Sequence, residues 1–385
     1  MNSNVNYFGV NKIKKSAKKP VIRFSGFTNE WERQSVKELC SITTGKSNTQ
    51  DQDSNGKYPF YIRSEIVAKS NKFLYDCEAV ITIGDGNIGR VFHYVNGKFD
   101  LHQRCYKMAD FNTVTGKYFY YFFSTKFYDR AMRMTAKATV DSVRLDMIGD
   151  MEIAYPKEVT EQNKISLFLD KFEDLLALHQ RKCQKLQNIK EAILEKMFPK
   201  NNADKPQIRF KGYTYAWERQ SVKELCSITT GKSNTQDQDS NGKYPFYIRS
   251  EIVAKSNKFL YDCEAVITIG DGNIGRVFHY VNGKFDLHQR CYKMADFNTV
   301  TGKYFYYFFS TKFYDRAMRM TAKATVDSVR LDMIADMEIA YPKEVTEQNK
   351  ISLFLDKFED LLALHQRKCE KLQNIKEAIL EKMFC

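Results

Sequence analysis

The most regular pattern of apolar positions lies in the segment 160–198, which contains neither proline nor glycine. Side chains that suit a buried face recur there at steps of three and four residues, which predicts one apolar stripe along a helix. The stripe comprises Ile165, Phe168, Phe172, Leu175, His179, Cys183, Leu186, Ile189, Ile193 and Met197. Thr160 is the expected N-cap, and Pro199 ends the helix. Such a helix is about 58 Å long and needs a partner of similar length to cover its stripe.

Short apolar runs dominate the segment before this helix. They are rich in β-branched and aromatic residues and are interrupted by the dipeptides Asn55-Gly56 and Asn96-Gly97, a pattern that predicts short strands joined by turns. Asn96-Gly97 is expected to form a tight hairpin turn. One further helix is predicted over 117–136. The segment up to about Pro156 is therefore expected to be a domain of the α/β (α+β) class and of ordinary size.

The whole pattern occurs twice. Residues 31–198 recur at 217–384 with only two differences, which are Gly149 against Ala335 and Gln184 against Glu370. The two halves must therefore fold alike, and the second copy supplies a helix with the same stripe. Because the second domain starts soon after the first helix ends, the second helix is expected to run back antiparallel to the first.

We therefore predict two tandem domains separated by a long antiparallel two-helix coiled-coil spacer. The predicted segments are a basic flexible tail (1–19), a first domain (20–159), a first spacer helix (160–198), a linker (199–205), a second domain (206–345) and a second spacer helix (346–385). Two identical domains held apart in this way are expected to be related by an approximate two-fold axis. The DNA duplex has an axis of the same kind, which is why dimeric readers meet inverted half-sites.

Charge and cysteine usage narrow the class of partner. A formal net charge of +13 and a pI near 9.1 favour a polyanion, nucleic acid before membrane. The longest aromatic run, 118–123, is far too short to span a bilayer, and no apolar segment follows the basic N-terminal residues as it would in a signal peptide. The nine cysteines form no Cys-x-x-Cys pair, which disfavours zinc or redox chemistry and fits reduced thiols in the cytoplasm.

A literal GxGxxG string occurs at 84–89 and again at 270–275. A dinucleotide site needs a helix directly after the glycines, because the helix N-terminus holds the phosphates. Here the residues that follow, 90–95, are β-branched and aromatic and predict a strand. The glycines are instead expected to form a tight loop between two strands, whose backbone can approach another backbone closely.

Three sequence features, each present twice, carry a resemblance to a known family. They are the string PxIRFxGxTxxWE at 20–32 and 206–218, the string YPFYIRSEIV at 58–67, and MEIAYPKEVTEQNKISLFL at 151–169, which opens the long helix. The last contains a Pro-x-x-x-x-Glu-Gln-x-x-Ile join formed by Pro156, Glu161, Gln162 and Ile165, repeated as Pro342, Glu347, Gln348 and Ile351. Together these features resemble the specificity subunit of type I restriction-modification systems, over essentially the whole chain from Pro20.

The resemblance implies two target-recognition domains that each read one half of a split sequence in double-stranded DNA, with the helical spacer as a ruler. It also implies two methyltransferase (modification) subunits that methylate adenine and restriction/translocase subunits that join for cleavage. Members of the family usually carry two unlike domains and read an asymmetric site. This chain departs from that pattern, because its two domains are nearly identical. A palindromic split site is therefore expected.

The chain is not expected to be an enzyme. Adenine-N6 methyltransferases carry an Asn/Asp-Pro-Pro-aromatic turn, and this chain has no Pro-Pro. The string 40-CSITTGKS-47 ends like a P-loop but has Cys40 where the first glycine belongs. We expect no cofactor and no metal in this chain. Base flipping and methyl transfer, with S-adenosylmethionine, would belong to the partner methyltransferase.

Base-edge and phosphate contacts are expected from Arg, Lys, Gln, Asn and His side chains on loops. The candidates in the first copy are Lys46, Asn48, Arg63, Asn87, Arg90, His102, Gln103, Arg104, Lys137 and Thr139. The candidates in the second copy are Lys232, Asn234, Arg249, Asn273, Arg276, His288, Gln289, Arg290, Lys323 and Thr325.

Two other classes of protein share some of these features. A stand-alone DNA-binding regulator that recognises inverted repeats would share the charge and the symmetry, but it usually reads DNA with a short helix and needs no long spacer. Copurification with a methyltransferase chain would distinguish a specificity subunit from such a regulator. A nucleotide-using enzyme would need the GxGxxG or GKS string to function, and binding of a dinucleotide or S-adenosylmethionine by the isolated chain would favour it.

Overall fold

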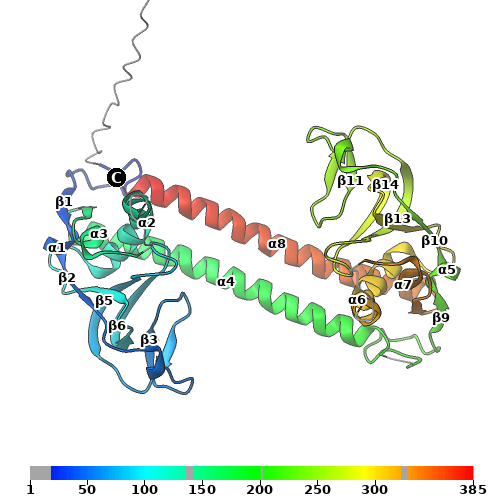
Figure 1. The fold of residues 1–385 in the computed structure, drawn as a ribbon, viewed down its shortest axis with the longest axis horizontal. Coiled ribbons are helices and arrows are strands. Elements are labelled where there is room, and N and C mark those ends of the chain that lie inside the picture. Colours follow the sequence, from blue (N-terminus) through cyan, green and yellow to red (C-terminus); the bar gives the residue numbers. More distant parts are fainter. Residues whose placement is uncertain (1–18, 136–141, 201–202, 322–327, 385) are drawn as a thin grey trace, which may run out of the picture. The chain divides into compact units, whose positions relative to one another are not determined.

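The computed structural model describes residues 19–135, 142–200, 203–321 and 328–384. The chain forms two compact units (Figure 1). Unit 1 comprises Met1–His179 together with Lys368–Cys385, and unit 2 comprises Gln180–Arg367. Each unit therefore contains one α/β domain, the first half of the long helix that follows that domain, and the last part of the other long helix.

The domain of unit 1 is built on a six-stranded sheet with the order β2-β7-β5-β6-β3-β4. Its strands are β2 (Ser41–Thr44), β3 (Tyr58–Tyr61), β4 (Ala68–Ser70), β5 (Tyr75–Ile83), β6 (Phe92–Leu101) and β7 (Cys105–Ala109). Neighbouring strands are antiparallel except β3 and β6, which are parallel through Phe60↔Asp100 and Tyr61↔Leu101. A separate antiparallel pair joins β1 (Glu32–Ser35) to β8 (Glu152–Tyr155).

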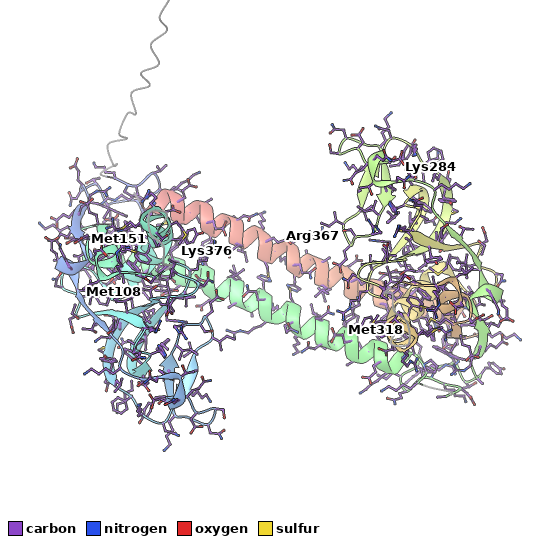
Figure 2. The ribbon with its side chains drawn as sticks, viewed as in Figure 1. Met108, Met151, Lys284, Met318, Arg367 and Lys376 are labelled. Atoms are coloured by element: carbon purple, nitrogen blue, oxygen red, sulfur yellow. The ribbon has the colours of Figure 1, made fainter. Side chains whose placement is uncertain are left out.

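Helix α2 (Gly116–Thr135) confirms the helix predicted over 117–136 and supplies much of the core. Its fully buried rings stack in sequence along the helix, with centroids 5.4 Å apart between Phe119 and Phe123 and 4.6 Å apart between Phe123 and Phe127. Met108 of β7 and Met151 lie buried in the same core (Figure 2). The short helices α1 (Val36–Leu39), η1 (Thr49–Asp51) and α3 (Leu145–Gly149) were not predicted.

The hairpin turn predicted at Asn96-Gly97 is wrong. Both residues lie inside β6, where Asn96 pairs with Glu78 and Gly97 with Cys77 of β5. The connection between β5 and β6 is made by the glycine loop 84–91 instead. Continuous pairing with β5 overrides the local turn preference of the dipeptide, and Gly97 accommodates it with a φ of 127°.

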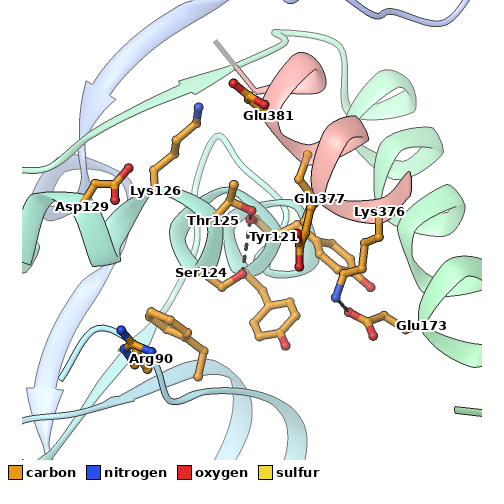
Figure 3. A pocket seen from close by; sticks show the side chains of 13 residues that line it. Arg90, Tyr121, Ser124, Thr125, Lys126, Asp129, Glu173, Lys376, Glu377 and Glu381 are labelled. Carbon is orange, nitrogen blue, oxygen red and sulfur yellow. Dashed lines mark hydrogen bonds and ion pairs between the residues drawn. The ribbon is translucent and has the colours of Figure 1, made fainter. Parts of the chain in front are cut away.

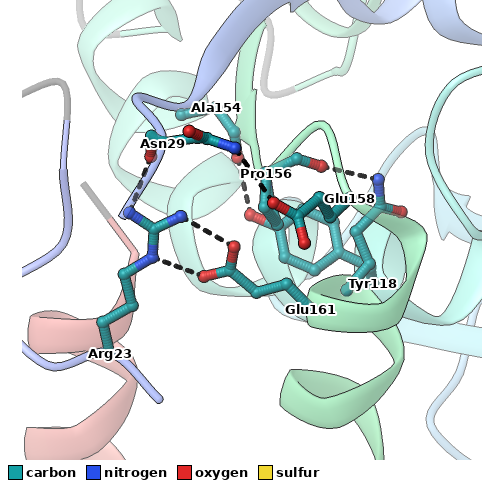
Figure 4. Close-up of polar contacts among 8 residues, drawn as sticks. Arg23, Asn29, Tyr118, Ala154, Pro156, Glu158 and Glu161 are labelled. Atoms are coloured by element: carbon teal, nitrogen blue, oxygen red, sulfur yellow. Dashed lines mark hydrogen bonds and ion pairs between the residues drawn. The ribbon is translucent and has the colours of Figure 1, made fainter. Parts of the chain in front are cut away.

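Helix α4 (Val159–Met197) confirms the long helix, and buried polar contacts fix its first turn to the domain (Figure 4). Gln162 is fully buried: its Nε2 donates to the Pro156 and Thr113 carbonyls, and its Oε1 accepts from the Thr115 N–H at 2.7 Å. Glu161 is also buried and accepts two hydrogen bonds from Arg23, at 2.7 and 2.8 Å. The Glu-Gln pair of the join therefore has a structural task, which is to set the direction in which α4 leaves the domain.

The start of α4 differs by one residue from the prediction. The helix begins at Val159, so Thr160 lies within its first turn and is not the N-cap. The N–H groups of Glu161 and Gln162 donate to the Glu158 carbonyl, which places the helix start just before Thr160. A shift of this size is ordinary for a helix end.

The seam of α4 follows a seven-residue repeat, as in a coiled coil. Its residues are buried or half-buried at every position of the repeat, which are Ile165, Leu169, Phe172, Leu176, His179, Cys183, Leu186, Lys190, Ile193 and Met197. Leu175 and Ile189 of the predicted stripe are exposed instead, and Leu176 takes the buried place. A strict period of 3.5 residues places Leu176 and Lys190 in the seam. Steps of three and four residues in a less strict order are equally consistent with Leu175 and Ile189, which is why the predicted stripe contains them.

In unit 1 the end of helix α8 (Val345–Met383) packs against α4 in antiparallel orientation. Glu173 of α4 forms an ion pair with Lys376 of α8, with 2.5 Å between Oε1 and Nζ. Phe384, directly after α8, packs against Tyr118 and Phe122 in the domain from which α4 starts. The predicted antiparallel pairing of the long helices is confirmed within this unit.

Unit 2 repeats this arrangement with the roles of the two helices exchanged. Lys190 of α4 pairs with Glu359 of α8 at 2.9 Å, and Phe198 packs against Tyr304 and Phe308. The elements of its domain are β9 (Glu218–Ser221), α5 (Val222–Leu225), β10 (Ser227–Thr230), η2 (Thr235–Asp237), β11 (Tyr244–Tyr247), β12 (Ala254–Ser256), β13 (Tyr261–Ile269), β14 (Phe278–Leu287), β15 (Cys291–Ala295), α6 (Gly302–Thr321), α7 (Leu331–Ala335) and β16 (Glu338–Tyr341). Among the described residues, no helix combines the length and apolar character needed to cross a membrane.

We expect the paired substitution Glu161→Gln and Glu347→Gln to destabilise both units. Each change leaves a largely buried arginine, Arg23 or Arg209, without its carboxylate, and breaking a buried ion pair costs about 3 kcal/mol. Urea unfolding followed by circular dichroism measures the effect. The matched control, Asp150→Asn with Asp336→Asn, removes exposed ion pairs to Lys37 and Lys223 and should leave the midpoint unchanged. Equal midpoints for the two variants would contradict the role assigned to the join.

Candidate nucleic-acid interface

Five of the predicted contact residues line one shallow cavity in unit 1. Its volume is about 490 Å³, and we call it the reading hollow. The residues that line it are Asn48, Thr49, Gln50, Arg63, His102, Gln103 and Arg104. These side chains come from three separate loops, and the structure brings them together at one edge of the six-stranded sheet.

The parallel pairing of β3 and β6 explains why these loops meet. Because Tyr61 pairs with Leu101, the residues that follow both strands emerge at the same edge, which places Arg63 beside His102. The third loop joins them through the backbone: the Ser47 N–H donates to the Leu101 carbonyl at 3.1 Å, and the Gln103 N–H donates to the Ser47 carbonyl at 2.9 Å.

A buried carboxylate anchors the loop of residues 46–50. Asp100 is fully buried, and its Oδ1 accepts from the Ser47 hydroxyl at 2.6 Å and from the Leu101 N–H at 2.9 Å. Lys46 and Asn48 lie on either side of Ser47 and are exposed. The loop therefore holds its backbone to the sheet edge while its polar side chains remain available to a ligand.

Asp85 joins the two arginines of the reading hollow. Arg104 Nη1 donates to Asp85 Oδ2 at 2.7 Å, and Arg63 Nη1 lies 3.2 Å from each oxygen of the same carboxylate. Burial alone would raise the pKa of Asp85, but hydrogen bonds from Arg104 and Arg63 outweigh it and lower the pKa below its ordinary value of 3.8. The carboxylate is therefore ionised at neutral pH and holds both guanidinium groups.

His102 lies beneath these arginines and is neutral. Burial and the charge of Arg63 lower its pKa from the ordinary value of 6.5, and its side chain is only 4% exposed. Its Nδ1 accepts the Arg104 N–H at 3.1 Å, so the ring proton is on Nε2. His102 thus fixes the backbone of the Arg104 loop.

Two predicted residues lie elsewhere on the domain. Arg90 donates to the Tyr128 hydroxyl at 2.6 Å and stacks over its ring at 4.5 Å. It lines a second cavity of about 490 Å³ between α2 and the end of α8 (Figure 3). Asn87 is exposed on the glycine loop. Lys137 and Thr139, with their counterparts Lys323 and Thr325, lie outside the described residues.

Each glycine of the GxGxxG string has a structural reason to be glycine. A Cβ on Gly84 would lie 2.8 Å from the Arg104 carbonyl, so this glycine allows the loop to approach the Arg104 backbone. Gly86 and Gly89 have φ values of 82° and 68°, which favour glycine. The string therefore forms the expected tight loop between strands, and it closes on another part of the same domain.

Unit 2 repeats these side-chain contacts with the residues of the second copy. Arg290 and Arg249 pair with Asp271 at 2.7 and 3.2 Å, and the His288 Nδ1 accepts the Arg290 N–H at 3.1 Å. The remaining predicted residues of this copy are exposed or half-buried on the corresponding loops, and they are Lys232, Asn234, Asn273, Arg276 and Gln289. As in unit 1, Arg276 is held by a tyrosine, Tyr314.

The reading hollow offers hydrogen-bond donors and positive charge. It contains no cysteine, and burial raises the pKa of the nearby Cys105 thiol to about 12, which keeps that thiol protonated. Within the described ranges no cluster of three or more His, Cys, Asp or Glu side chains is suited to a metal ion. The arrangement suits recognition of an anionic, acceptor-rich ligand.

Sequence reasoning found the basic and amide side chains of the hollow and the loop that contains Ser47, but it missed Asp85 and Asp100. Side chains that attract DNA are recognisable by their charge or their donors, whereas a carboxylate repels phosphate and gives no such signal. The position of Asp85 between two loop glycines, after a predicted strand, was a signal that the residue lies at the same sheet edge as the candidates.

Comparison with known proteins identifies the family. The model of the family described as "Type I restriction modification DNA specificity domain" matches residues 28–188 and 215–374, which together make up most of the chain. The type I restriction enzyme EcoDI specificity subunit of Escherichia coli is 22% identical over 311 residues, 67% of this chain and 69% of that protein.

Two solved structures share the fold. The crystal structure of the S subunit of a type I restriction-modification system from M. genitalium superposes with a TM-score of 0.72 at 15% identity, covering 95% of this chain and 99% of that chain. A second structure, from work on the complex assembly and conformational transition of the type I restriction-modification system, superposes with a TM-score of 0.52 at 14% identity. The superposition covers 92% of this chain and 97% of that chain. The chain belongs to the type I restriction-modification specificity family and is the non-catalytic DNA-specificity subunit of such a system.

Proposed function

We propose that this chain reads a palindromic, split DNA target. In this proposal residues 20–159 and 206–345 are target-recognition domains, and the helices over 160–198 and 346–385 are the spacer that sets the gap between half-sites. The observation that supports it is the repetition of the same side-chain cluster in both domains: Arg63 and Arg104 pair with Asp85 at the same distances as Arg249 and Arg290 pair with Asp271. Identical surfaces favour identical half-sites.

Within each domain we assign base reading to the hollow and backbone contacts to its surroundings. Arginine, glutamine and asparagine side chains pair with base edges in the major groove, and the hollow contains all three types. Lys46, Asn87 and Arg90 are assigned to phosphates, where positive charge or a simple donor suffices. Lys137 and Thr139 keep their assignment as DNA contacts from the sequence, as do Lys323 and Thr325.

Two modification subunits are assigned to a second apolar face of the long helices. In unit 1 Leu167, Leu175 and Leu178 are 57%, 41% and 45% exposed, and their spacing places them on one face of α4 away from the seam. The equivalent leucines of α8 in unit 2 are exposed to the same extent: Leu353, Leu361 and Leu364. Large apolar side chains exposed in a row are typical of a protein–protein interface.

The rest of the assembly follows from the family. S-adenosylmethionine is assigned to the modification subunits, which would flip and methylate adenine, and this chain is assigned no cofactor. Restriction/translocase subunits would join the same complex for cleavage, in the cytoplasm. The charge of +13 supplies the salt-dependent part of DNA affinity.

The modified motif tests the palindromic target directly. Sequencing of modified bases in DNA from cells that express this chain with its modification subunits should show one split motif, whose two halves are the same sequence on opposite strands. The expected result follows from the near-identity of the two domains. A motif with two different half-sites would refute the proposal.

Substitution of one exposed leucine in each unit tests the docking face. Leu175→Lys with Leu361→Lys places a charge in each proposed interface, and we expect affinity for the modification subunits to fall at least 10-fold, about 1.4 kcal/mol or more. Native mass spectrometry should show that Leu175→Lys alone leaves one modification subunit bound.

The matched control for this test is Leu145→Lys with Leu331→Lys. These leucines lie on α3 and α7 and are 55% and 53% exposed, so they report the effect of an added charge outside the proposed face. Retention of two modification subunits by the Leu175 and Leu361 variant would exclude this face as the docking surface.

A further inference from the structure

An acidic side chain lies beside the reading hollow, whose lining contains basic, amide and hydroxyl groups but no carboxylate. Asp85 is only 20% exposed and faces Arg63 and Arg104, which are 47% and 62% exposed. A carboxylate near a DNA-reading surface opposes binding of phosphate, since like charges repel. The same contacts recur around Asp271 in the second copy, as the near-identical sequence requires.

Backbone contacts at Gly84 and at Asp85 itself hold the loop in place. The Gly84 N–H donates to the Arg104 carbonyl at 2.8 Å, and the Gly84 carbonyl accepts from the Val143 N–H at 2.7 Å. Asp85 itself forms an antiparallel bridge with Ser142. The carboxylate is thus attached to a backbone that cannot shift away from Arg104 without breaking these bonds.

Each arginine contacts the carboxylate of Asp85 through its Nη1 nitrogen. Arg63 and Arg104 each use only Nη1, and their Nε and Nη2 groups donate to no described residue. Each guanidinium therefore keeps donors for a ligand while one of its nitrogens is fixed. A fixed arginine loses less side-chain entropy on binding than a mobile one, which sharpens the difference between a correct and an incorrect partner.

We propose that Asp85, and Asp271 in the second copy, are positioning residues that hold a pair of arginines to read guanine in each half-site. This rests on the proposed function of the reading hollow. Guanine offers O6 and N7 as two acceptors on its major-groove edge, and arginine matches them with two donors. Phosphate also accepts from arginine, but a phosphate contact carries no sequence information and gains nothing from an orienting carboxylate.

The charge balance supports base reading over phosphate binding. Two guanidinium groups and one carboxylate carry a net charge of only +1, so the cluster sacrifices electrostatic attraction to the backbone. What the cluster retains is a fixed set of donors. Loss of the carboxylate should therefore weaken discrimination between bases while the overall salt-dependent affinity is maintained.

The test uses the chain assembled with its modification subunits and a pool of duplexes with randomised sequence. Bound duplexes are sequenced for the unchanged complex and for Asp85→Asn with Asp271→Asn. We expect the unchanged complex to select a guanine in each half-site. In the variant, the preference at that position should fall about 10-fold while the other positions of the motif and the salt dependence of binding stay the same.

Two further variants keep the test decisive. Arg104→Gln with Arg290→Gln changes exposed side chains that the fold tolerates, and it should lose preference at the same guanine even where the aspartate variant folds poorly. Asp146→Asn with Asp332→Asn removes an exposed carboxylate that pairs with Arg144 or Arg330 outside the hollow, and it should leave the motif unchanged.

The outcomes separate this inference from the proposed function. Equal weakening at all positions in the aspartate variant, or an unchanged motif in both the aspartate and the arginine variants, overturns the positioning role and leaves the palindromic target standing. A motif of two unlike half-sites from the unchanged complex overturns the palindromic target, whereas the loss of one guanine per half-site would still support the role of Asp85.

Discussion

Buried polar contacts in the first turn of each long helix fix that helix to its domain, and the helix pairing within each unit builds on this attachment. Gln162 is bonded to three backbone groups and Glu161 to Arg23, so α4 leaves the domain in one fixed direction. The two repeated motifs that flank the domain, PxIRF and the Glu-Gln join, are the two halves of this one contact. In the proposed function the long helices set the gap between half-sites, and a spacer of this kind needs a reading domain that is rigidly attached to it.

Ion pairs in the seam between the helices also fix geometry, because they select the register of the two helices. The ion pair Glu173–Lys376 lies in unit 1, and the equivalent pair Glu359–Lys190 lies in unit 2. In unit 1 the glutamate belongs to α4 and the lysine to α8, and in unit 2 the helices are exchanged. An ion pair within a coiled-coil seam contributes little net stability but selects one register over its neighbours. The register in turn fixes which turns of α4 and α8 face each other within each unit.

The parts of the fold that depend on local pattern could be predicted from the sequence. The long helices, α2 and the glycine loop follow from apolar spacing, aromatic content and the residues around the glycines. The sequence does not show whether Leu175 or Leu176 lies in the seam, because both are leucine. Only packing against the partner helix distinguishes an apolar period of 3.5 residues from one of 3.6. Asn96-Gly97 has a strong turn preference that pairing with β5 overrides. Arg63 and His102 are brought together by the parallel pairing of β3 and β6, which no local pattern reveals.

In the proposed function the arginine–aspartate clusters of the two domains face DNA in the same way at both half-sites. A structure of this chain bound to its modification subunits and a cognate duplex measures this most directly. We expect each pair of arginines to lie in the major groove and to remain joined to its aspartate: Arg63 and Arg104 in one domain, Arg249 and Arg290 in the other. Hollows that face solvent or a protein subunit, with DNA held by other loops, would contradict it.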